Sequence, residues 1–132
     1  MKLNKTQIAS FIEGYLTAAL WSSSDTLEDG STVDLDNYEW GNGEAEKLHA
    51  DCISFIEANN DDLWIYPDHY TPPSGYDVWE CAGHDFWLTR NGHGTGFWDR
   101  GLGELGERLT EASDTFGTVE LYLGDDELVY VA

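Results

Sequence analysis

Acidic residues outnumber basic residues by 26 to 6 in this 132-residue chain, which gives a formal net charge of −20. The excess is evenly spread, because residues 1–66 and residues 67–132 each carry 13 acidic and 3 basic side chains. The chain is also 41% hydrophobic and 14% aromatic, far more than a disordered acidic segment contains. We therefore predict one folded domain over residues 1–132, with strong repulsion between the carboxylates on its surface.

This charge excludes several classes of partner. Nucleic acids and anionic membrane surfaces bind clustered positive charge, so we expect neither as a direct partner.

No apolar run reaches the roughly 18 residues of a membrane span, and the first residues lead into an amphipathic pattern rather than a signal peptide. Cys52 and Cys81 are too few for a disulfide framework. Their pairing stays open, and a reduced cytoplasmic protein is the simpler expectation.

Helical periodicity is clear in three segments. Apolar residues recur at helical spacing from Ile8 to Leu20, after a capping-box pattern formed by Asn4 and Gln7. The same periodicity recurs twice further along the chain. The sequence predicts a first helix that ends near residues 22–24, a second over residues 44–59 and a third over residues 102–116.

The segments between these helices are expected to form strands and loops. All three prolines fall within residues 63–79, which predicts strand fragments joined by loops. Residues 85–90 and 95–98 are predicted to pair as a hairpin through Asn91 and Gly92, because Asn-Gly is a strong signal for a tight turn.

A last hairpin is expected at the end of the chain, where residues 118–123 and 127–131 flank a Gly-Asp-Asp turn. The order of helices and strands predicts an α+β fold. In this fold, an antiparallel sheet of about three to five short strands packs against about three helices.

The densest motif is GHDFWLTRNGHGTGFWDRG, which covers residues 83–101. Together with residues 103–110 and 121–126, it resembles a family of small uncharacterised proteins encoded by tailed bacteriophages and prophages. The resemblance covers about residues 83–130. It implies an origin in a mobile element, and therefore the cytoplasm of a bacterial host, but it assigns a role to no residue.

The same motif supports an alternative function as a small enzyme or a metal- or ligand-binding domain. Here His84 and His93 would ligate a metal or transfer protons, while Arg90 or Arg100, with Asp99 nearby, would hold an anionic substrate. The competing interpretation is that the aromatic residues pack and the arginines neutralise carboxylates. We expect no metal or cofactor, because metal sites need three or four ligands and the usual His and Cys spacings are missing.

Two other patterns are weaker. Residues 25–36 overlap a calcium-binding loop, but Leu27 and Val33 occupy ligand positions, so an acidic surface loop is expected. The alternating glycines of residues 92–96 resemble a phosphate-binding loop, but such loops open a helix, and here a hairpin turn is expected.

The acidic surface is the strongest functional feature, because small domains need a net charge of magnitude only about 2–8 for solubility. A rival explanation for the excess of acidic residues is a salt-adapted host, whose proteins are acidic throughout. The favoured hypothesis is a non-enzymatic inhibitor that mimics DNA, as anti-restriction and anti-CRISPR proteins do. It would occlude a basic nucleic-acid-binding site on a host defence or DNA-handling protein. The residues expected to contact this partner are Glu104, Glu107, Glu111, Asp114, Glu44, Glu46, Glu57, Asp61 and Asp62. The oligomeric state stays open.

Overall fold

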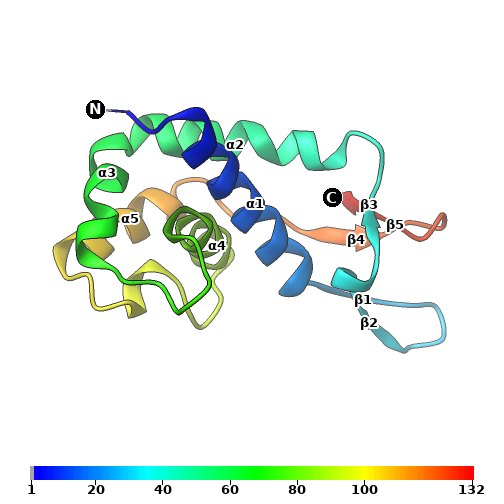
Figure 1. Ribbon diagram of the computed structural model, residues 1–132. Helices are drawn as coiled ribbons and strands as arrows, with labels where there is room; N and C mark the ends of the chain where they lie inside the picture. The colour runs from blue at the N-terminus through cyan, green and yellow to red at the C-terminus, as the bar shows by residue number, and fades with distance from the viewer. Residues whose placement is uncertain (1) are drawn as a thin grey trace.

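The computed structural model describes residues 2–132, which form a single-domain α+β fold (Figure 1). The strands lie together at one end of the molecule, and the helices fill the rest of it and reach the strands. The elements in chain order are α1 (Lys5–Trp21), β1 (Ser24–Thr26), β2 (Thr32–Asp34), η1 (Leu35–Asn37), β3 (Glu39–Trp40), α2 (Glu44–Ala58), α3 (Asn60–His69), α4 (Val78–Arg90), η2 (Phe97–Asp99), α5 (Glu104–Asp114), β4 (Leu121–Leu123) and β5 (Leu128–Val131). The α+β class is confirmed, and residues 2–132 contain five α-helices rather than about three.

The three helices predicted from periodicity are present as α1, α2 and α5. The capping box is also confirmed. The Gln7 amide donates to the Asn4 side chain, and the Asn4 amide donates to the Gln7 side chain, both at 2.8 Å. These bonds satisfy two of the amide groups that the first turn of a helix leaves unpaired.

The predicted hairpin over residues 85–98 is wrong, because residues 85–90 are the end of α4. This helix is capped at its N-terminus by Asp77, whose carboxylate accepts from the amides of Trp79 and Glu80 at 2.8 and 3.3 Å. The Asn-Gly pair ends the helix instead of turning a hairpin. Gly92 has a φ of 69°, and its amide donates to the Thr89 carbonyl, which is typical of a helix C-terminus.

The strand fragments predicted over residues 63–79 are also wrong. Helix α3 extends to His69 and contains Pro67 in its last turn, and residues 70–77 are loop. Because this helix is only ten residues long, a proline near its end removes one hydrogen bond without interrupting a longer run.

The strands form two small sheets instead of one antiparallel sheet. Strands β1 and β2 pair as an antiparallel hairpin, whereas the second sheet has the order β3-β5-β4. In the second sheet, β5 is antiparallel to β4, as expected for the last hairpin, but parallel to β3. Asp25 in β1 accepts from the Leu123 amide in β4 at 2.8 Å, which fixes the first hairpin beside the second sheet.

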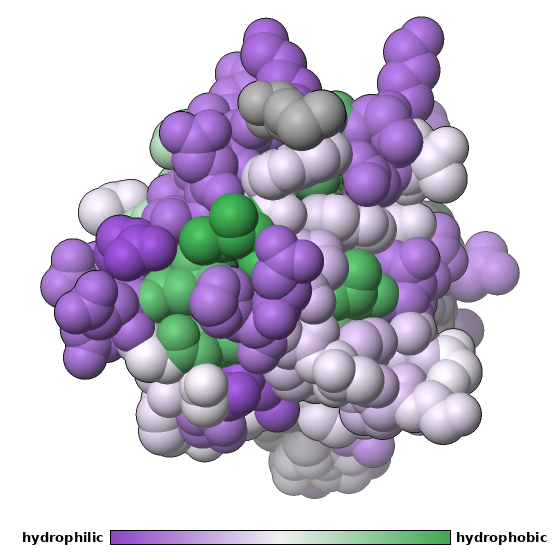
Figure 2. Space-filling model, turned by 60° about the vertical axis from the view of Figure 1, so that its left-hand side comes forward, coloured by the Kyte–Doolittle hydropathy of each residue, from purple (hydrophilic) through white to green (hydrophobic). Residues whose placement is uncertain are grey.

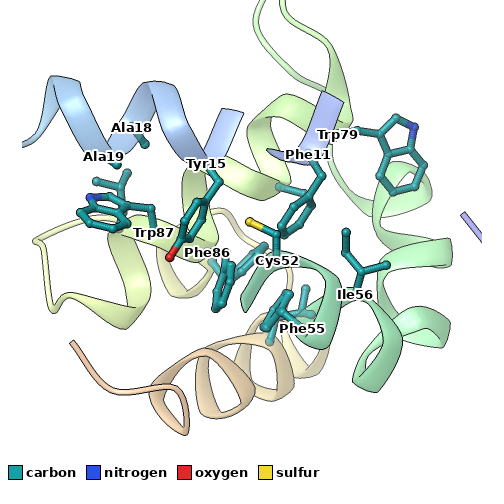
Figure 3. Close-up of a cluster of buried hydrophobic side chains, with 14 of the residues drawn as sticks. Phe11, Tyr15, Ala18, Ala19, Cys52, Phe55, Ile56, Trp79, Phe86 and Trp87 are labelled. Carbon is teal, nitrogen blue, oxygen red and sulfur yellow. The ribbon is translucent and has the colours of Figure 1, made fainter. Parts of the chain in front are cut away.

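The core forms where α1 crosses α4. Two glycines allow the two backbones to touch, because a Cβ atom at Gly83 would lie 1.9 Å from the Phe11 carbonyl oxygen and one at Gly14 would lie 2.0 Å from that of Glu80. Aromatic rings from three helices fill the space beside this contact (Figure 3). The tightest pair is Phe55 and Phe86, which stack with ring centroids 4.0 Å apart.

Most of the face shown in Figure 2 is hydrophilic, with small hydrophobic areas between the polar side chains. None of the helices in residues 2–132 has the length and apolar character needed to cross a membrane.

Candidate functional site

Ion pairs inside the fold occupy most of the basic side chains. Within residues 2–132 the pairs are Lys47–Glu44 at 2.5 Å, Arg90–Asp51 at 2.7 Å, Arg100–Asp85 at 2.8 Å, Arg108–Asp62 at 2.9 Å and a longer contact, Arg100–Asp99, at 3.8 Å. Four of the six basic residues and five of the 26 acidic residues are therefore paired. The other 21 acidic residues are balanced only by the charges of Lys2 and Lys5, so the surface charge is almost entirely negative.

Helix α5 carries a stripe of carboxylates, which we call the acidic stripe. It consists of Glu104, Glu107, Glu111 and Asp114, all of which are exposed. Steps of three and four residues place them along one side of the helix, while Leu105 and Leu109 are buried. The one basic residue of this helix, Arg108, makes a bidentate contact with Asp62 of α3, at 2.9–3.1 Å.

The acidic residues of α2 and α3 are not equally available. Glu46, Glu57 and Asp61 are exposed, whereas Asp62 is half-buried and paired with Arg108. Glu44 was also expected to contact the partner, but it is only 4% exposed.

The Glu44 carboxylate binds Lys47 and accepts from the Val131 amide of β5. The hydrogen bond with Lys47 holds the pKa of Glu44 below its usual range. Glu44 therefore connects α2 to the sheet and is not part of an exposed partner-binding surface.

Arg90, expected as a possible anion ligand, is a structural residue instead. It is 5% exposed and donates to the Asp51 carboxylate, the Tyr15 hydroxyl and the carbonyls of Phe116 and Gly117, at 2.7–2.9 Å. Its guanidinium therefore joins α1, α2, α4 and the segment after α5. No anionic substrate can reach it without breaking these contacts.

The two histidines predicted to act together lie in different pockets. His93 lines a pocket of about 520 Å³ beside Trp87 and β4, whereas His84 lines a pocket of about 430 Å³ between α1 and α4. Asp99 serves as a turn residue, since its carboxylate accepts from the Gly96 amide and the Thr95 hydroxyl at 3.1 and 3.2 Å. The predicted five-residue site around one hairpin is therefore not assembled.

The pocket lined by His84, which we call the α1–α4 pocket, is formed by residues from two helices and a loop. Helix α1 contributes Gly14, Thr17 and Trp21, which lie on one face of that helix. Helix α4 contributes Glu80, Cys81, His84 and Asp85, and the loop after α3 adds aromatic rings. The Trp21 ring packs on the His84 ring with centroids 5.5 Å apart.

A buried ion pair forms part of the pocket wall. The Asp85 carboxylate is 1% exposed and accepts from the Nη2 and Nε atoms of Arg100 at 2.8 and 3.1 Å. Burial raises the pKa of Asp85, and the hydrogen bond and charge of Arg100 oppose this shift. The Tyr66 hydroxyl lies 3.5 Å from the same carboxylate.

The other titratable groups of the pocket are not activated for covalent chemistry. Burial raises the pKa of the Cys81 thiol above its ordinary value of 9.0, so it stays protonated at neutral pH. Burial lowers the pKa of His84 below 6.5, so its imidazole is neutral there. No group of three or more His, Cys, Asp or Glu side chains in residues 2–132 is arranged to hold a metal ion. This arrangement favours binding over nucleophilic chemistry.

Sequence reasoning identified His84 and Arg100 but missed Trp21, Tyr70, Tyr76 and Glu80. One signal was available, because Cys81, His84 and Asp85 are spaced three and four residues apart and share one face once this segment is helical. Comparisons of the chain with protein-family models, with curated proteins and with solved structures find no match.

Proposed function

We propose that the protein is an acidic binding protein that occludes the nucleic-acid-binding site of a basic partner, as DNA mimics do. The observation that carries this proposal is the separation of charge within the fold. Four of the six basic residues form ion pairs with acidic residues of the same chain, while α5 presents four exposed carboxylates in one stripe.

The charge density of the acidic stripe is about two-thirds of that of one nucleic-acid strand. From Glu104 to Asp114 the helix rises about 15 Å, which gives one carboxylate per roughly 5 Å. One strand of duplex DNA carries one phosphate per about 3.4 Å. A row of Lys and Arg that follows a phosphate backbone could therefore pair with this stripe, and the field of the whole molecule would speed the encounter.

The kind of partner follows from the resemblance of residues 83–130 to small phage proteins. That resemblance supports a host restriction, CRISPR or other DNA-handling protein as the target, and the cytoplasm of the bacterial host as the place of action. The proposed mechanism is competitive and needs no catalysis, because bound protein and bound DNA exclude one another.

A competition assay tests this proposal. The purified protein is titrated into complexes of a fluorescent DNA duplex with a panel of bacterial proteins, such as a type I restriction enzyme, a Cas nuclease and a nucleoid protein. We expect displacement of DNA from at least one of them, with an apparent affinity that falls steeply as salt is added. Failure to displace DNA from any member of the panel at low salt contradicts the proposal.

A matched pair of variants tests the surface. Changing Glu107 and Glu111 to Gln and Asp114 to Asn removes three charges from the acidic stripe and should weaken displacement at least about tenfold. The control changes Glu28 and Glu39 to Gln and Asp36 to Asn. These three are also exposed and have no side-chain hydrogen bond in residues 2–132. Equal weakening by both variants would assign the effect to total charge rather than to α5.

A further inference from the structure

The α1–α4 pocket combines exposed aromatic rings with a concave shape. Trp21 and Tyr76 are 58% and 64% exposed, which is unusual for such large aromatic residues. The half-buried Tyr70 lines the same pocket. The volume of about 430 Å³ is within the range of small-ligand sites. Large exposed rings gathered around one hollow are typical of a binding site rather than of ordinary protein surface.

The charges that line this pocket do not cancel. Arg100 supplies the one guanidinium, and two of its nitrogens are committed to Asp85. Glu80 has no basic partner in residues 2–132, so its carboxylate leaves the lining with a net negative charge. His84 adds no positive charge at neutral pH, because burial lowers its pKa. An anionic ligand would meet this carboxylate within a molecule that already carries a charge of −20.

We propose that the α1–α4 pocket binds a planar organic cation, such as an amidinium or guanidinium group, through the rings of Trp21 and Tyr76 and the carboxylate of Glu80. Aromatic rings attract cations through their negative faces, and tryptophan does so most strongly. The contact with His84 limits the motion of the Trp21 ring before a ligand arrives, which reduces the entropy lost on binding. The pocket does not involve α5, so this inference is independent of the function proposed for the acidic stripe.

Benzamidine and benzamide form a suitable pair of probes, because they have nearly the same shape and only benzamidine is charged. Each is titrated into ¹⁵N-labelled protein while the indole N–H signal of Trp21 is followed, with benzoate as the anionic comparison. We expect a saturable shift with benzamidine, at least about tenfold tighter than with benzamide, and no binding of benzoate. Equal affinity for benzamide, or tighter binding of benzoate, overturns the proposal.

Variants locate the interaction. Glu80→Gln should weaken benzamidine binding about tenfold and leave benzamide unchanged. Trp21→Ala should weaken both, as measured by the backbone amide signals of the α4 residues that line the pocket, because this variant has no Trp21 indole signal. Glu111→Gln removes the same charge from the acidic stripe, and it should bind benzamidine like the parent. If Glu80→Gln folds normally in its NMR spectrum and still binds benzamidine like the parent, the assigned counter-charge is wrong.

The guanidinium group could belong to a free small molecule or to an arginine side chain of a protein. Agmatine and the blocked peptide acetyl-Gly-Arg-Gly-amide distinguish these sources. Binding of agmatine but not of the peptide indicates a small-molecule site, and peptide binding of equal or higher affinity indicates a site for a partner's arginine. A Trp21 signal that responds to neither overturns the proposal for guanidinium groups.

Discussion

Gly83 of α4 lies so close to Phe11 of α1 that a Cβ atom at position 83 would sit 1.9 Å from the Phe11 carbonyl oxygen. Because that oxygen belongs to a helix backbone, it cannot move aside without shifting α1. We predict that Gly83→Ala lowers the free energy of unfolding by about 1–3 kcal/mol or more, as overpacked cores do. Urea denaturation monitored by circular dichroism measures the change.

Gly94→Ala is the matched control for this prediction. A Cβ atom at Gly94 would meet nothing within 4 Å, and its φ is not in the left-handed region. Its denaturation midpoint should equal or slightly exceed that of the parent, because alanine restricts the unfolded chain. A Gly83→Ala protein as stable as Gly94→Ala would refute the close contact between α1 and α4.

The buried Arg90 and the exposed Arg108 should differ greatly in their effect on stability. We predict that Arg90→Met destabilises the fold by about 3–5 kcal/mol, because it leaves Asp51, Tyr15 and two carbonyl groups without their donor. Arg108→Met breaks an exposed pair with Asp62, and its Tm should stay close to that of the parent. Similar losses in both variants would contradict the structural role assigned to Arg90.

Surface repulsion should make the fold sensitive to salt. With 21 acidic side chains outside any ion pair in residues 2–132, Tm should rise as salt increases from about 0.02 M to about 0.5 M, because the Debye length shortens from about 20 Å to about 4 Å. The α5 variant that lacks three carboxylates should start from a higher Tm and gain less. If Tm does not change over this range for either protein, repulsion between the surface carboxylates does not destabilise the fold.

The half-buried His84 should make stability depend on pH. Its pKa is lowered by burial, with Arg100 acting in the same direction and Asp85 in the opposite one. As the pH falls below about 6.5, the unfolded chain takes up a proton at this position before the folded protein does, so the stability present at higher pH is lost.

Thermal melts of the parent and of His84→Gln at several pH values between about 7.5 and 5.5 measure this effect. The Tm of the parent should fall relative to that of the variant as the pH decreases. A constant difference between the two proteins would show that His84 does not contribute to the pH dependence.

Periodicity predicted α1, α2 and α5, which each have one exposed side. It failed for α3, which is short and contains Pro67, and for α4, whose last six residues are all buried. Helix α5 alternates exposed acids with buried leucines, so both the helix and its acidic stripe followed from spacing alone. Residues 85–90 are all buried, but only Phe86, Trp87 and Leu88 among them are apolar, and so short an apolar run does not distinguish a buried helix from a strand. The next residues, Asn91 and Gly92, fit a hairpin turn as well as a helix end.

The α1–α4 pocket could not be predicted from local pattern. Its groups come from α1, from the loop after α3, from α4 and from Arg100, and only the packing of these segments brings them together. Trp21 is the last residue of α1 and follows the apolar residues of its periodic pattern, which pack in the core or against it. Nothing in the sequence marks Trp21 as the wall of a cavity.

The central place of β5 in its sheet also determines the order in which the fold can be completed. Strand β3 pairs with β5 through Glu39 and Leu128, which most of the chain separates, and β3 has no contact with β4 in the sheet order. Closing so long a loop is slow compared with forming neighbouring helices. While the ribosome makes the chain, α1 and α2 can form early, whereas the edge of β3 must stay unpaired until β5 has been synthesised. The three-stranded sheet is therefore the last part of the domain to assemble.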